Sequence, residues 1–153
     1  MKTMLKKLSI IAVILLALSS CRVNNGDIGD YFGSWSLYDM KIDGETPDDF
    51  DPELTFWQFQ NNIIDICRVG FMYDRDGHWG TWSEENDRLL LNFMHHDGDA
   101  APGSGGYSAP SWIGFTSDEI ISLKFVSRDS KSMTLSWNSP DGRQYTYSLR
   151  KIW

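Results

Sequence analysis

The chain has 153 residues and a formal net charge of −7, which becomes −10 once the three lysines among residues 1–20 are removed with the leader described below. This acidic balance argues against nucleic acid as a partner, because phosphates require a basic surface, and against a face that lies on anionic lipid. Residues 31–153 suffice for one domain with a sizeable core, and seven Trp, six Tyr and eight Phe favour strands over helices.

Residues 1–20 have the pattern of an export signal: lysines precede an apolar run over 8–18 that is too short to span a bilayer comfortably. The run ends in Leu18-Ser19-Ser20-Cys21, which resembles the signal of bacterial lipoproteins. The resemblance implies cleavage before Cys21 and lipid attachment to it, which would anchor the protein in a membrane. The alternative is an ordinary signal peptide with a chance cysteine. Residues 21–30 are then a lipidated tether, and we expect the outer membrane, on its periplasmic face or at the cell surface.

Alternating apolar residues predict strands along almost the whole remaining chain. A parity change near Asp39 predicts a bulge in the first strand, and no helix of more than two turns is expected. The eight expected strands cover about 34–42, 53–59, 63–73, 78–83, 88–94, 119–127, 132–138 and 143–152. Eight antiparallel strands with short connections predict a closed up-and-down barrel, with a filled interior or room for one small ligand.

Three motifs carry a resemblance to a family. Gly33-Ser34-Trp35 opens the first strand, Gly80-Thr81-Trp82 precedes Leu89, Leu91 and Phe93, and the chain closes with Asp141-Gly142 before alternating Tyr145, Tyr147 and Leu149. Their order and spacing resemble the lipocalin-like (calycin) lipoproteins of Bacteroidetes-type bacteria, a largely uncharacterised family. The resemblance implies an all-β, single eight-stranded lipocalin-like barrel over residues 31–153.

The resemblance also implies which end of the barrel is closed. Gly33 and Trp35 would plug the closed end, and lipocalins lay a basic side chain over this tryptophan, for which Lys151 and Arg150 are both candidates. Connections 43–52, 74–77, 95–111 and 139–142 would then meet at the open end. The connection 95–111 is long, glycine-rich and irregular, which is typical of functional or disordered loops.

The sequence contains no nucleophile elbow, phosphate loop or catalytic triad pattern, so we expect neither an enzyme nor a cofactor. A metal site at His95-His96-Asp97-Gly98-Asp99 or a calcium site at 48–53 is less favoured than a solvated loop, because the ligand spacing is wrong. Cys67 is expected to be a small buried hydrophobe rather than a reactive thiol. Asp65 shares its parity with apolar residues and lies in the lumen if that face points inward; the alternative places Ile64 and Ile66 inside.

Aromatic residues in the central hairpin and the long loop give the binding hypothesis. The candidate ligand-binding residues are Trp79, Trp82, Tyr107, Trp112 and Asp65. We expect a membrane-anchored, non-catalytic binding protein for a small apolar or amphipathic ligand or a glycan at the open end. The alternatives are an interaction or inhibitor module, with a filled barrel whose acidic surface docks an envelope protein, and, less favoured, a hydrolase using Asp65 or the His95–His96 pair.

Overall fold

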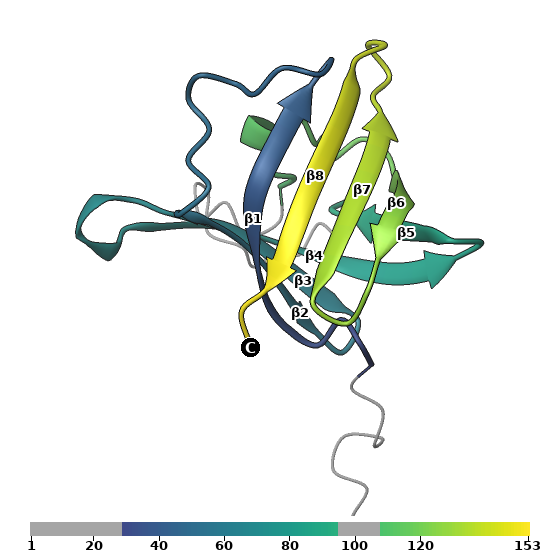
Figure 1. Ribbon diagram of the computed structural model, residues 1–153, viewed down its shortest axis with the longest axis horizontal. Helices are drawn as coiled ribbons and strands as arrows, with labels where there is room; N and C mark the ends of the chain where they lie inside the picture. The colour runs from purple at the N-terminus through teal and green to yellow at the C-terminus, as the bar shows by residue number, and fades with distance from the viewer. Residues whose placement is uncertain (1–28, 95–107) are drawn as a thin grey trace, which may run out of the picture.

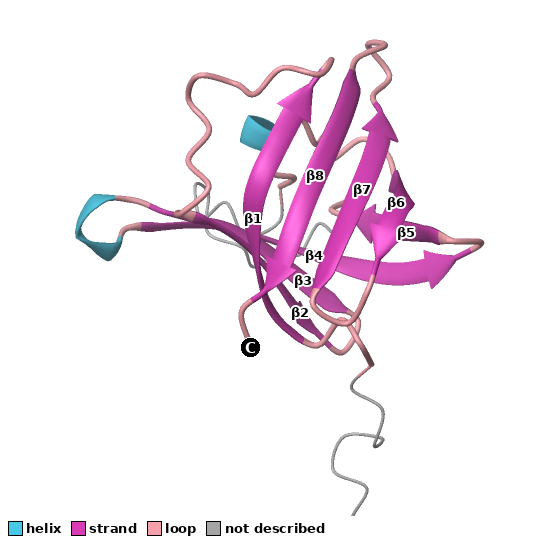
Figure 2. Cartoon of the chain, viewed as in Figure 1, coloured by secondary structure: helices cyan, strands magenta, loops and turns pink. Residues whose placement is uncertain are grey.

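The computed structural model describes residues 29–94 and 108–153, which form an eight-stranded β-barrel (Figure 1). The strands are β1 Gly33–Ile42, β2 Thr55–Gln60, β3 Ile63–Val69, β4 Arg75–Glu85, β5 Arg88–Asn92, β6 Ile121–Arg128, β7 Ser132–Asn138 and β8 Gln144–Lys151. Within the described residues, helix is restricted to two short turns, η2 Phe71–Tyr73 and η3 Ser111–Ile113 (Figure 2). The predicted all-β fold with eight strands is confirmed.

The barrel is closed by hydrogen bonding between the first and last strands. Each strand pairs antiparallel with the next, and β8 returns to β1 with Trp35 opposite Lys151 and Ile42 opposite Tyr145. The register of this pair shifts between Leu37 and Asp39, which confirms the predicted bulge. Closure leaves neither terminal strand with an unpaired edge, and such edges are the usual sites of unwanted strand pairing.

Large apolar side chains fill the interior. In β8, Tyr145, Tyr147 and Leu149 are buried and belong to the core cluster, as the alternation along this strand predicts. The same holds for inward positions on other strands, namely Leu37, Leu91, Phe93, Phe125 and Trp137. Burial of this aromatic and aliphatic area is the main favourable contribution to folding, at roughly 25 cal/mol per Å².

The β3–β4 hairpin is longer than predicted and turns earlier. The strand expected over 63–73 ends at Val69, and the expected turn 74–77 is wrong, because residues 75–77 already belong to β4. The chain reverses over residues 70–74, where Met72 adopts a left-handed backbone conformation (φ 58°). Gly77 is a strand residue: a Cβ there would lie 2.5 Å from the Arg75 guanidinium. This glycine therefore permits a close approach on a strand rather than a turn.

Other strand ends differ from the prediction by a few residues. The second strand begins at Thr55 rather than near residue 53, because the chain turns over 51–54 and the Leu54 amide donates to the Asp51 carbonyl over 3.4 Å. The fifth strand ends at Asn92 and the sixth begins at Ile121, two residues inside their expected limits.

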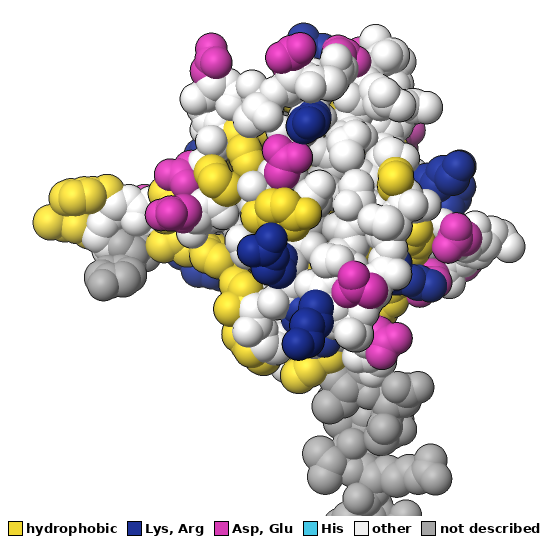
Figure 3. Space-filling model, in the orientation of Figure 1, with side chains coloured by type: hydrophobic (Ala, Val, Ile, Leu, Met, Phe, Trp, Pro, Cys, Tyr) yellow, Lys and Arg dark blue, Asp and Glu magenta, His cyan; other side chains and the backbone are white. Residues whose placement is uncertain are grey.

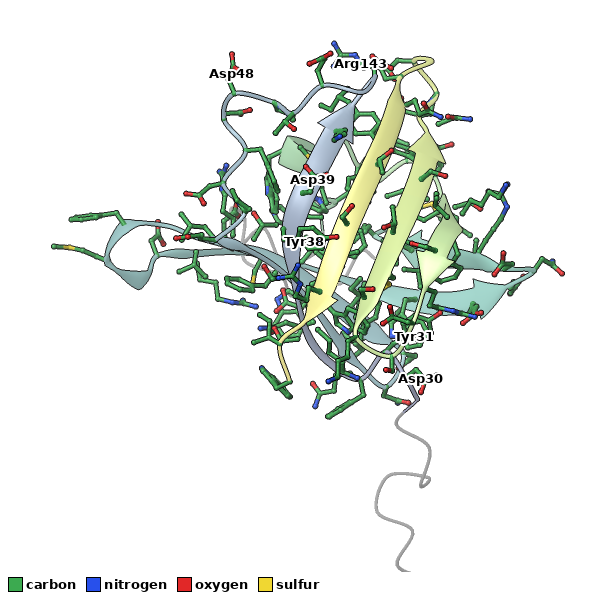
Figure 4. The ribbon with its side chains drawn as sticks, in the orientation of Figure 1. Asp30, Tyr31, Tyr38, Asp39, Asp48 and Arg143 are labelled. Atoms are coloured by element: carbon green, nitrogen blue, oxygen red, sulfur yellow. The ribbon has the colours of Figure 1, made fainter. Side chains whose placement is uncertain are left out.

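The two ends of the barrel are easily told apart. Figure 4 shows Asp30 and Tyr31 where the chain enters the barrel, and Asp48 and Arg143 on connections at the opposite end. The end with Asp30 and Tyr31 is the closed end predicted from the sequence, and the end with Asp48 and Arg143 is the open end. The β3–β4 hairpin projects beyond the barrel wall and carries hydrophobic side chains at its tip (Figure 3). Of the helical segments in the described ranges, none has the length and hydropathy needed to cross a membrane.

Candidate functional site

Trp35 lies at the closed end and is 2% exposed. Its indole N–H donates to the Tyr31 carbonyl over 2.8 Å, and the Lys151 ammonium lies 5.4 Å from the centre of its ring. Of the two basic candidates, Lys151 is therefore the one over the tryptophan. Arg150 has the opposite parity and lies on the outside of the barrel, 4.8 Å from the ring of Tyr38. The glycine at position 33 is required by a positive φ of 121° and by the backbone of Trp153, which a Cβ would overlap.

A polar cluster closes the same end. The Tyr31 hydroxyl donates to Glu84 over 2.6 Å, and Arg128 donates both to the Tyr31 hydroxyl and, over 2.8 Å, to the other carboxylate oxygen of Glu84. Burial raises the pKa of Glu84, but the hydrogen bonds from Tyr31 and Arg128 outweigh this and lower the pKa overall. Burial and the hydrogen bond to Glu84 raise the pKa of Tyr31. The closed end of the barrel is thus stabilised by an ion pair and hydrogen bonds as well as by packing.

Glu84→Gln tests this cluster through its pH dependence. A carboxylate whose pKa is lowered by folding stabilises the native state above its ordinary pKa of 4.5, and this contribution is lost as the pH falls through the folded value. We expect wild type to be more stable than the variant at pH 7, with a difference that shrinks below about pH 4.5. Urea midpoints between pH 7 and 3 measure it. Glu85→Gln is the control, and an equal pH dependence for both variants would contradict the cluster's role.

Asp65 lies on the outer face of the barrel, because Ile64 and Ile66 occupy the interior. It is nonetheless only 3% exposed, and it forms an ion pair with Arg75. Burial raises the pKa of Asp65, while the charge and hydrogen bond of Arg75 lower it. Cys67 is buried on the same face, and burial raises the pKa of its thiol, so it is not poised as a thiolate nucleophile. Of the two placements that the sequence left open, the structure therefore has the one with Ile64 and Ile66 inside.

The tryptophans proposed as ligand-binding residues do not lie together. Trp79 faces outward, is 44% exposed and lies 5.9 Å from the Arg75 guanidinium. Trp82 faces inward near the closed end, where its ring centre lies 4.9 Å from that of Tyr31 and 5.4 Å from that of Phe59. Trp112, in η3, lies at the open end. The remaining candidate, Tyr107, and the His95–Asp99 segment lie outside the described residues.

The segment before β6 closes the open end from within. Ile113 and Phe115 are buried, and the Tyr147 hydroxyl donates to the Ile113 carbonyl over 2.7 Å. Burial raises the pKa of this tyrosine well above its ordinary value, so it remains a neutral donor. Gly114 has a φ of 88°, and a Cβ there would overlap the ring of Tyr145. The barrel is thus filled by its own connection as well as by its strands.

A small hollow remains at the mouth, beside this segment. The Arg68 guanidinium lies 5.3 Å from the centre of the Trp112 ring. The hollow has a volume of about 20 Å³, enough for a single water molecule, and its lining includes Met40, Phe50 and Thr55. A ligand larger than water would bind at this point only if the segment around Trp112 moved.

His78, near the mouth, is held by polar contacts on both ring nitrogens. Its Nδ1 lies 2.7 Å from the Ser108 carbonyl, which can only accept, so Nδ1 carries a proton. Its Nε2 lies 3.2 Å from a carboxylate oxygen of Asp76. No group of three or more potential metal ligands occurs in residues 29–94 and 108–153.

A larger hollow, which the sequence analysis missed, lies on the outside of the barrel at its open rim. Pairing between β6 and β7 begins at Lys124 and Ser136, so the preceding residues 121–123 of β6 and the last residues 137–138 of β7 are not paired with each other. The resulting β6–β7 cleft has a volume of about 610 Å³. Its lining consists of Arg88, Glu119, Ile120, Ser122, Lys124, Ser136, Trp137, Asn138, Pro140 and Gln144. Periodicity places the polar strand residues of this lining outward, but it does not reveal where the hydrogen bonding between β6 and β7 stops.

The fold is shared with two solved structures. A lipocalin-like protein from Bacteroides uniformis ATCC 8492 is 16% identical, with a TM-score of 0.55, over 81% of this chain and 100% of that chain. An uncharacterized protein from Bacteroides eggerthii DSM 20697 is 14% identical, with a TM-score of 0.55, over 80% of this chain and 99% of that chain. No protein-family model matches the sequence, and no curated protein matches it. The chain therefore has the lipocalin-like barrel fold, as its sequence motifs predict.

Proposed function

We propose that the protein is a non-catalytic binding protein of the cell envelope, anchored through lipid on Cys21, which takes a small amphipathic ligand or a glycan at its open end. The observation that supports this most directly is the size of the β6–β7 cleft. The interior is packed with aromatic rings, with Phe115 lying 5.8 Å from Trp57 and 5.3 Å from Tyr147 between ring centres. The larger of the two hollows at the open end, by contrast, has the size of a small-ligand site.

Thermal unfolding of the full-length protein in detergent, with a panel of lipids and of neutral and acidic oligosaccharides, tests the proposal. A ligand at 100 times its Kd adds about 2.7 kcal/mol of stability, which appears as a clear rise in Tm. In cells supplied with a radioactive fatty acid, wild type should take up label and Cys21→Ser should not. Absence of any shift across the panel would contradict small-ligand binding, and labelling of Cys21→Ser would contradict the anchor.

A second candidate function, docking of an envelope protein, is favoured by the β3–β4 hairpin. At its tip Phe71 is 87% exposed and Met72 is 82% exposed, although burial of such side chains is normally favourable. Met72 has a left-handed backbone conformation, which residues other than glycine rarely adopt. The tip therefore holds two adjacent apolar side chains outward at some cost in conformational energy. This function gains support if the ligand panel gives no shift.

A further inference from the structure

The β6–β7 cleft is a break in an otherwise continuous barrel wall. β6 residues 121–123 pair with β5 on one side, and β7 residues 137–138 pair with β8 on the other. Figure 1 shows β7 extending beyond the start of β6 in the direction of the open end. Two strand edges therefore face each other across a hollow of about 610 Å³ instead of forming a ladder.

Two cations lie side by side in this cleft. Arg88 of β5 is directly opposite Lys124 of β6, and both line the hollow. Like charges in directly opposite positions destabilise a sheet. Arg88 donates to the carbonyl and the hydroxyl of Ser122 over 3.4 and 3.3 Å, but neither cation takes part in an ion pair within the described residues. Glu119 is the single carboxylate of the lining. In a protein with an excess of acidic residues, this pair of positive charges favours an anionic occupant.

The rest of the lining suits a hydroxyl-rich molecule. The four uncharged polar side chains, Ser122, Ser136, Asn138 and Gln144, each offer both hydrogen-bond donors and acceptors, as sugar hydroxyls require. Apolar contact is available from Ile120, which is 50% exposed, and from Pro140. A saccharide ring has the complementary features, because it carries several hydroxyl groups and a smaller apolar face.

The length of the open edges argues against a peptide. A strand added to a sheet gains its affinity from main-chain hydrogen bonds, and strands in proteins are usually five or six residues long. Here the free edges extend over three residues of β6 and two of β7. A compact ligand that bonds mainly to side chains uses such a site better than an extended chain does.

We propose that the β6–β7 cleft binds an acidic saccharide, with its carboxylate at Arg88 and Lys124 and its hydroxyls at Ser122, Ser136, Asn138 and Gln144. This inference rests on the proposed function and names the ligand class and the residues that select it. The carboxylate accepts charge-assisted hydrogen bonds from the two cations, which are stronger than those between neutral groups. The ligand also removes the repulsion between Arg88 and Lys124, so binding and local stability are coupled.

Calorimetric titration of the full-length protein with a galacturonic acid trimer tests the site. The same trimer with its carboxyls reduced to hydroxymethyl groups should bind at least 10-fold more weakly, since a hydrogen bond to a charged group is worth about a factor of ten. Arg88→Gln and Lys124→Gln should each weaken binding of the acidic trimer by roughly 10-fold. Lys131→Gln is the matched control. It also removes one positive charge, but from the turn between β6 and β7 at the closed end of the barrel.

The outcomes separate this inference from the proposed function. Binding that is insensitive to both cleft substitutions, or equally sensitive to Lys131→Gln, overturns the cleft as the site. Equal binding of a triglutamate peptide shows that charge alone is recognised and overturns the saccharide. A neutral compound that shifts Tm in the panel, with an effect unchanged in the cleft variants, overturns the cleft site and supports the proposed function. Absence of trimer binding also overturns the inference, and the panel then decides the proposed function separately.

Discussion

Trp35→Ala should lower the free energy of unfolding by roughly 3–5 kcal/mol, the usual cost of deleting a large aromatic side chain from a core. The indole is almost completely buried, and its removal leaves both a cavity and an unpaired Tyr31 carbonyl. It also exposes Lys151, which loses a contact with the ring worth about 0.5–2 kcal/mol. Urea unfolding followed by circular dichroism measures the loss.

The matched control for Trp35 is Trp79→Ala, since Trp79 is 44% exposed on the outer wall. We expect its cost to be below about 1 kcal/mol, as for most exposed positions. If Trp35→Ala fails to fold, Trp35→Phe retains part of the packing and should still be less stable than the Trp79 variant. Equal stabilities for the Trp35 and Trp79 variants would show that Trp35 does not close the barrel.

Phe115→Ala should also cost roughly 3–5 kcal/mol and, unlike Trp35→Ala, should change what the protein binds. The ring of Phe115 lies 5.5 Å from Trp137 and 6.3 Å from Phe93, in the middle of the barrel. Its removal leaves an apolar cavity lined by aromatic rings, and dry cavities of this kind bind small apolar molecules. Saturating benzene should therefore raise the Tm of the variant and leave wild type unchanged.

Phe71→Ala provides the same chemical change at an 87% exposed position and should leave stability nearly unaffected. Two results would show that Phe115 does not fill the barrel. One is an equal effect of the Phe71 and Phe115 substitutions on unfolding. The other is a Tm of wild type that responds to benzene as strongly as that of Phe115→Ala.

The inner face of most strands could be predicted because polar and apolar residues alternate. β7 and β8 face water on one side only, so Leu135 and Trp137, or Tyr147 and Leu149, mark the interior without ambiguity. β3 is different, since four consecutive residues from Ile64 to Cys67 are buried. A strand buried on both sides has no readable period, which is why Asp65 could not be assigned to either face from the sequence.

The turn of the β3–β4 hairpin was mispredicted because a glycine can mark either a turn or a close contact on a strand. Asp74-Arg75-Asp76-Gly77 has the composition of a turn, yet Gly77 pairs with Cys67 inside the sheet. The physical reason is the Arg75 side chain, which passes over Gly77 to reach Asp65. Such a contact depends on the register of two strands, which composition does not specify.

The candidate site could be predicted only in part, for the same reason. Placing the ligand-binding candidates in one group required Trp79, Trp82 and Trp112 to converge, and the pairing of the strands separates them. The β6–β7 cleft depends on where the hydrogen bonding between two strands stops, and the sequence of neither strand alone shows this. Local sequence patterns thus indicate which face of each strand is buried. The geometry of the open end depends instead on how neighbouring strands align with one another.

The entry of the chain at the closed end sets how an anchored molecule would be oriented. Gly29 lies eight positions after Cys21, and an extended chain spans at most about 3.5 Å per residue, or about 28 Å in all. With lipid on Cys21, the closed end would therefore lie within about 28 Å of the bilayer. The mouth, with Asp48 and Arg143 on its rim, lies at the opposite end of the barrel from this attachment point (Figure 4). The membrane anchor would therefore leave the open rim accessible to diffusing solutes.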